Sequence, residues 1–116
     1  MSYREQFIWN RSVDLAVNCY SLTQLFPKSE LYGLTSQIRR SAVSVASNIA
    51  EGYGRRTKNE YLHFLYISLG SLRELDTQLI IAQRVNLADN QLFTPLIKEV
   101  EEMQRIMVAT VNKLKT

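Results

Sequence analysis

Apolar and polar residues alternate at helical spacing between residues 37 and 52, where the pattern is clearest. One apolar stripe follows the four-three-four spacing of a helix face and consists of Ile38, Ala42, Val45 and Ile49. A polar stripe runs beside it and consists of Gln37, Ser41, Ser44 and Asn48. Because most of these side chains are small, we expect this helix to lie very close to its neighbours.

Capping and breaking residues predict four helices in all, and the stretch above belongs to the second. The first begins near Asn10 or Ser12 and ends before Pro27. The second, which contains the stretch above, begins at Ser29, whose hydroxyl can cap it. The predicted helices span about residues 10–26, 29–53, 57–84 and 89–114.

The starts of the third and fourth helices carry distinct signals. Thr57 and Glu60 have the Ser/Thr-x-x-Glu spacing of a capping box, which begins the third helix. Two starts are open for the fourth: Asp89 caps it directly, or Thr94 caps it with Pro95 at the first helical position.

This pattern predicts an all-α single domain, residues 1–116, folded as an antiparallel up-down four-helix bundle. The third helix is apolar nearly all round between Tyr61 and Leu72, so it needs a second partner besides the bundle core. We expect copies of the same chain to supply that partner, through an interface at Phe64, Ile67 and Ser71.

Composition and charge bear on the expected partners and location of the protein. The 116 residues are 46% hydrophobic and carry a net charge of +3, a mild bias toward anionic partners. Neither an export signal nor a membrane-length apolar run is evident, so we expect a cytoplasmic protein that does not enter a membrane. The single cysteine, Cys19, lies in an apolar-periodic stretch where a buried, inert thiol is the common state.

One pair of residues suggests catalysis. Glu60 and His63 have the Glu-x-x-His spacing that supplies two ligands in di-iron helix bundles. A full site needs two such pairs and two more carboxylates, whereas His63 is the single histidine and Glu60 serves the capping box. The sequence therefore predicts a protein that is not an enzyme, without catalytic residues, bound metal or cofactor.

Two polar groups of residues remain. Asn48 and Glu51, near Arg40, together with Asp76, predict a buried polar network, for which we favour a structural role over a functional one. The second group is basic and is a candidate nucleic-acid-binding site, with Tyr53 and Tyr61 as stacking platforms, made of Arg39, Arg40, Arg55, Arg56 and Lys58. The alternative is a solvated helix end whose arginines form salt bridges.

Several motifs together resemble the bacterial family of 23S rRNA intervening-sequence proteins. The strongest are Gln37-Ile38-Arg39-Arg40 and, after it, Asn48-Ile49-Ala50-Glu51-Gly52. Others are Phe26-Pro27-Lys28, Tyr32-Gly33-Leu34-Thr35 and Gly70-Ser71-Leu72. The match runs from Trp9 to the final helix.

The resemblance implies an up-down bundle that assembles as a homopentameric ring. The family is similar to the accessory protein of diversity-generating retroelements, in which a basic surface engages nucleic acid and a reverse transcriptase. RNA, DNA or a protein is therefore an expected partner, although this chain is less basic than that relative. The resemblance implies no catalytic residues. A purely structural or protein-interaction ring is the alternative function.

Overall fold

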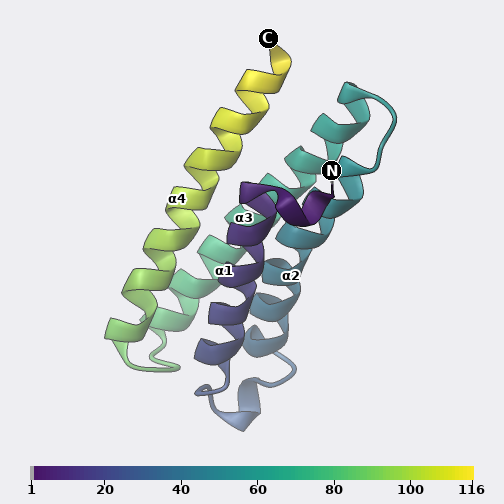
Figure 1. The fold of residues 1–116 in the computed structure, drawn as a ribbon. Coiled ribbons are helices and arrows are strands. Elements are labelled where there is room, and N and C mark those ends of the chain that lie inside the picture. The colour runs from purple at the N-terminus through teal and green to yellow at the C-terminus, as the bar shows by residue number, and fades with distance from the viewer. Residues whose placement is uncertain (1) are drawn as a thin grey trace.

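The computed structural model describes residues 2–116, which form four α-helices and two short 3-10 helices and contain no strand (Figure 1). The 3-10 helix η1 (Tyr3–Glu5) precedes α1 (Phe7–Thr23), and η2 (Lys28–Glu30) precedes α2 (Leu34–Tyr53). The remaining helices are α3 (Lys58–Arg84) and α4 (Asn90–Lys115). The predicted all-α class with four helices is confirmed.

The helices pack as a bundle of 43 × 22 × 20 Å. Each helix contacts two others: α2 lies between α1 and α3, and α4 lies between α3 and α1. Within the described chain no diagonal pair of helices approaches to 8 Å between Cα atoms. Short connections join each helix to the next along the chain (Figure 1).

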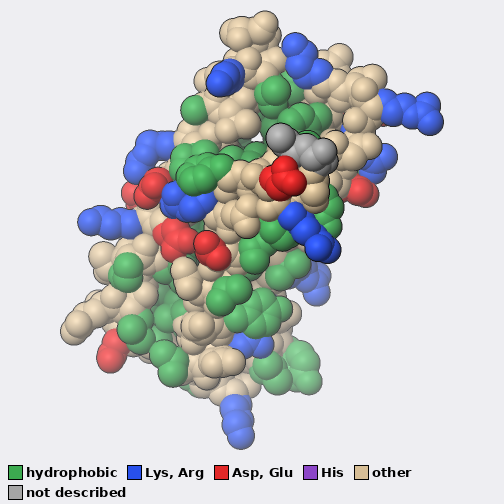
Figure 2. Space-filling view, in the orientation of Figure 1, with side chains coloured by type: hydrophobic (Ala, Val, Ile, Leu, Met, Phe, Trp, Pro, Cys, Tyr) green, Lys and Arg blue, Asp and Glu red, His purple; other side chains and the backbone are tan. Residues whose placement is uncertain are grey.

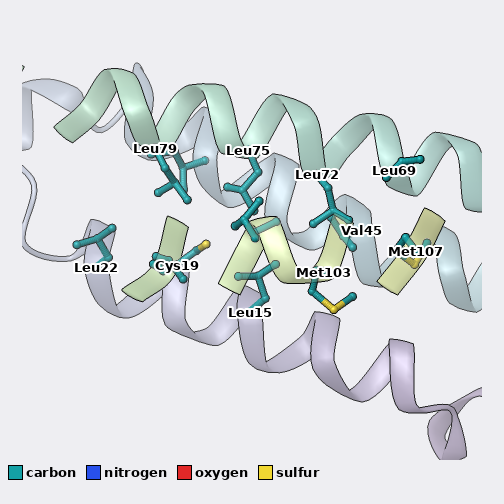
Figure 3. Close-up of a cluster of buried hydrophobic side chains, with 14 of the residues drawn as sticks. Leu15, Cys19, Leu22, Val45, Leu69, Leu72, Leu75, Leu79, Met103 and Met107 are labelled. Carbon is teal, nitrogen blue, oxygen red and sulfur yellow. The ribbon is translucent and has the colours of Figure 1, made fainter. Parts of the chain in front are cut away.

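The core is a single apolar cluster to which all four helices contribute (Figure 3). In α3 the row of Leu65, Leu72, Leu75 and Leu79 is completely buried. Facing residues include Leu15 and Cys19 of α1, Val45 of α2, and Met103 and Met107 of α4. Burial of these side chains is the main force that holds the helices together.

Small residues bring α2 against α3, as the sequence predicted. The Ser68 hydroxyl of α3 donates a hydrogen bond of 2.8 Å to the backbone carbonyl of Val45. A Cβ placed on Gly52 would lie 2.7 Å from Cβ of Phe64, closer than real contacts allow. A larger side chain at this glycine would force the two helices apart.

Two helices begin elsewhere than expected. Helix α1 starts at Phe7, and the Asn10 side chain, a predicted cap, instead donates to the carbonyls of Arg4 and Gln6. Helix α2 starts at Leu34 rather than near residue 29, because the Glu30 carboxylate accepts from the Leu34 amide at 3.2 Å.

Of the two predicted starts of α4, the structure has the one at Asp89. Asp89 occupies the N-cap position without a side-chain cap bond, and Pro95 lies inside the helix. No helix in the described chain is long and apolar enough to cross a membrane.

Candidate nucleic-acid interface

The five predicted nucleic-acid-binding residues lie in two places rather than one. Arg39 and Arg40 are near the start of α2. Arg55 and Arg56 lie in the connection from α2 to α3, and Lys58 is the first residue of α3. The intervening stretch of α2 rises by about 20 Å at 1.5 Å per residue. The five cations therefore cannot form one continuous patch on a single chain.

The α2–α3 connection belongs to a wider basic end of the bundle, defined here as Arg55, Arg56, Lys58, Lys113 and Lys115. The two lysines of α4 lie in its last turn, where positive charge also complements the helix dipole. Lys58 and Lys115 line one hollow of about 490 Å³, together with His63 and Tyr66. Figure 2 shows blue side chains around this upper end of the molecule.

Sequence reasoning missed the contribution of Lys113, Lys115 and Tyr66. The Lys115 Nζ atom lies 6.0 Å from the centre of the Tyr66 ring, so the end of α4 meets the first turns of α3. A signal for this was present, because the last turn of the predicted fourth helix ends next to the start of the third in an up-down bundle. Basic residues at those two ends are then neighbours.

Carboxylates neutralise only part of the basic end. Glu51 pairs with Arg55 at 3.1 Å, and Arg55 also stacks over Phe64 at 4.7 Å. Among residues 2–116, no carboxylate lies within 4.0 Å of the charged groups of Arg56, Lys58 or Lys115. These three exposed cations are free to neutralise phosphates.

The aromatic residues are arranged differently from the prediction. The Tyr61 hydroxyl accepts a hydrogen bond of 2.9 Å from the Gln6 side chain, and its ring packs against the core. Tyr53 is half-buried. Tyr66 is instead the exposed ring at this end, with 46% of its surface accessible. Tyr66, rather than Tyr61, is therefore placed to stack on a base.

The predicted polar network of Asn48, Glu51 and Asp76 is not one network, because its members have separate partners. The Asn48 amide donates to the carbonyl and hydroxyl oxygens of Ser44 at 2.8 and 3.0 Å. Ser44 in turn shares a hydrogen bond of 2.9 Å with Ser71, linking α2 to α3. Glu51 binds Arg55 at the surface.

Asp76 lies on the other side of α3, toward α4. Burial raises the pKa of its carboxyl and the negative charge of Glu101 adds to the rise, while a hydrogen bond with Gln104 opposes it. One carboxyl oxygen, Oδ1, is buried without a hydrogen-bond partner among the described residues. The charged form of Asp76 is therefore disfavoured at this place between α3 and α4.

The three predicted interface residues also differ in environment. Ser71 is buried and bonded to Ser44, so it holds α2 against α3 within the chain. Phe64 is half-buried beneath Arg55. Ile67 is 39% exposed and is the member of the set with the most accessible apolar side chain.

The groups considered for catalysis have other roles. The Glu60 carboxylate accepts from the Thr57 amide, completing the predicted capping box, and His63 packs edge-on against Phe64. Within residues 2–116 no group of three His, Cys, Asp or Glu side chains is placed to hold a metal ion. Burial, reinforced by the charge of Glu99, raises the pKa of the Cys19 thiol to about 12, so it is not a nucleophile at neutral pH.

Comparisons with known proteins agree with this structure. The sequence model of a family described as 23S rRNA-intervening sequence protein matches residues 4–109. A crystal structure from Bacteroides thetaiotaomicron, of a protein of unknown function from the S23 ribosomal protein family, has the same fold with a TM-score of 0.83. It is 18% identical, and the match covers 90% of this chain and 97% of that one. No curated protein matches the sequence.

Proposed function

Because the chain belongs to the family of 23S rRNA-intervening sequence proteins, we propose that it is a non-enzymatic adaptor that associates with nucleic acid. The observation that carries this proposal is the basic end, where Arg56, Lys58 and Lys115 have no carboxylate partner among the described residues. Binding through these groups is electrostatic, because neutralised phosphates release their counterions and no base needs to be read.

Self-association is the second part of the proposal. We infer an antiparallel up-down bundle that assembles into a homopentameric ring in the cytoplasm. If the bundle axes lie along the ring axis, five basic ends meet on one face of the ring. Weak contacts from each copy then add, so a strand held by several copies dissociates slowly.

A specific observation favours the alternative function, a structural or protein-interaction scaffold. A groove of about 570 Å³ runs along the outer face between α1 and α2. Val17, Tyr20 and Val43 line it and are 58%, 42% and 43% exposed. Figure 2 shows hydrophobic side chains gathered on this face. An apolar surface of this kind is typical of contacts with protein.

The deciding experiment measures the affinity for single-stranded RNA as a function of salt. For the wild type, log affinity should fall with log salt with a slope of about −0.7 per phosphate neutralised. Reversing two unpaired cations, in the variant Arg56→Glu with Lys58→Glu, should abolish binding. Arg55 is left unchanged because its reversal would place two carboxylates side by side, at residues 51 and 55.

A matched control reverses two exposed cations elsewhere, in the variant Arg84→Glu with Lys98→Glu. Both variants have the same net charge, so a loss confined to the first identifies the basic end rather than overall charge. Circular dichroism checks that both remain helical. If the wild type binds neither RNA nor DNA at low salt, the adaptor proposal fails and the scaffold becomes the better account.

A further inference from the structure

A second hollow, of about 460 Å³, lies at the start of α2. Tyr20 of α1, Tyr32 of the connection, and Ser36, Arg39 and Arg40 of α2 line it, and no lining residue is acidic. It is about 20 Å along α2 from the basic end, so it would form a separate contact. Its side chains combine two guanidinium groups with two aromatic rings.

Arg39 is held in place by α1. Its Nε donates a hydrogen bond of 2.9 Å to the Thr23 hydroxyl, and its guanidinium lies 4.6 Å from the centre of the Tyr20 ring. Among the described residues, neither Arg39 nor Arg40 pairs with a carboxylate. Glu30, the acid nearest in sequence, accepts instead from the Leu34 amide. A guanidinium fixed in this way is prepared to bind an anion such as phosphate.

Tyr32 supplies a free aromatic surface at the same hollow. Its side chain is 94% exposed, more than any other large hydrophobic side chain in the described chain. The Tyr20 ring already faces Arg39, whereas the Tyr32 ring is open to solvent. Base stacking on exposed aromatic rings next to cations is how single strands are bound without sequence preference.

From this juxtaposition we propose that the hollow binds one nucleotide of a single strand, with Arg39 and Arg40 holding a phosphate and Tyr32 stacking on the base. The inference rests on the proposed function and adds a contact to it. A strand long enough to reach both places is bound by each chain at the basic end and at this hollow. The chemistry is common to RNA and DNA.

The test replaces Tyr32, whose exposure means that its loss costs little stability. With fluorescent 12-nucleotide strands of RNA and of DNA, Tyr32→Ala should weaken binding about five- to tenfold. Tyr32→Trp should restore it, and tryptophan emission should be quenched by the stacked base. The salt slope should not change for either variant, because stacking releases no counterions. If Tyr32→Ala lost affinity for the RNA strand but not for the DNA strand, the nucleotide bound in this hollow would belong to RNA.

Arg40→Gln provides the complementary measurement. Removing a cation that holds a phosphate should reduce the salt slope by about 0.7, which a merely structural role would not do. Tyr66→Ala, at the basic end, is the matched aromatic control. Its effect on the affinity for the strand should be independent of the effect of Tyr32→Ala, because the two rings belong to separate contacts.

Two results would overturn the inference while leaving the proposed function intact. One is a wild type that binds RNA and a Tyr32→Ala variant that binds it equally well. The other is a change in oligomeric mass in Tyr32→Ala without a change in affinity per chain, which would make this surface a contact between copies. Absence of binding by the wild type would instead contradict the proposed function itself.

Discussion

Gly52 lies where α2 meets α3 with no room for a side chain. In Gly52→Ala the new Cβ would lie 2.7 Å from Cβ of Phe64 and 3.0 Å from Cδ1 of Tyr61. We expect a loss of about 1–2 kcal/mol in the free energy of unfolding, because overpacking outweighs the gain in helix propensity. Urea denaturation measures it.

Gly70→Ala is the matched control, since nothing lies within 4 Å of a Cβ added there. In that variant only the propensity gain remains, and stability should rise by about 0.5–1 kcal/mol. Equal effects at both glycines would contradict the close approach of α2 and α3.

Asp76 should make the fold less stable as pH rises. Its pKa is raised in the folded chain from the ordinary value of 3.8, so the native state holds the proton more tightly than the unfolded chain. The free energy of unfolding therefore falls as pH increases from about that ordinary value through the raised one. We expect Asp76→Asn to raise the melting temperature at neutral pH by a few degrees and to remove this part of the pH dependence.

Thermal denaturation of both proteins between acid and neutral pH tests the role of Asp76. Glu74→Gln is the control, because Glu74 lies on the same helix but is exposed. A variant Asp76→Asn that melts below the wild type at neutral pH would show that the carboxylate is stabilising.

At the scale of the helices, the sequence predicted correctly a helix start that is set by contacts between residues close together in the chain. The capping box at Thr57 and Glu60 was predicted because both partners lie within four residues of each other, and the structure contains it. The start of α1 was not predicted, because its N-cap residue Gln6 makes no side-chain cap bond. Packing rather than a cap determines that start: Ile8 is buried in the core.

Thr57→Ala should show how much the capping box contributes to α3. The threonine hydroxyl accepts from the Glu60 amide at 3.1 Å, and the Glu60 carboxylate accepts from the Thr57 amide at 3.3 Å. Loss of the cap should lower the free energy of unfolding by about 1 kcal/mol. Thr77→Ala, an exposed position inside α3, should change it by less than about 0.5 kcal/mol. Chemical denaturation of the three proteins makes the comparison.

At the scale of the whole molecule, the sequence identified cations but not their arrangement. Arg39 and Arg55 lie on one helix or at its end, so their separation follows from helix rise once the helix is known. The up-down order of the predicted helices indicates that the end of α4 is near the start of α3, but the contact of Lys115 with Tyr66 depends on how the two helices pack, which no local pattern encodes. Ser71 shows the same limit. The pattern of a single helix predicted that it lies on the surface, whereas α2 covers it in the structure.

Self-association is the last prediction. We expect light scattering at micromolar concentration to give a mass of five times 13.4 kDa, the ring that the family resemblance implies. Two different surfaces of one chain, the outer face of α3 and the α1–α2 groove, are available for a head-to-tail contact, which closes into a ring.

The variants Ile67→Glu and Val17→Glu each place a charge on one of these surfaces, at side chains 39% and 58% exposed. Either should reduce the mass if its surface lies in the contact, because a buried unpaired charge is costly. Both positions are exposed in the single chain, so circular dichroism should show folded variants. Phe64→Glu is less informative, since Phe64 is half-buried beneath Arg55 and its loss also disturbs the chain itself. A monomeric wild type would end the ring hypothesis, whereas a pentamer unaffected by either charge would show that neither surface forms the contact.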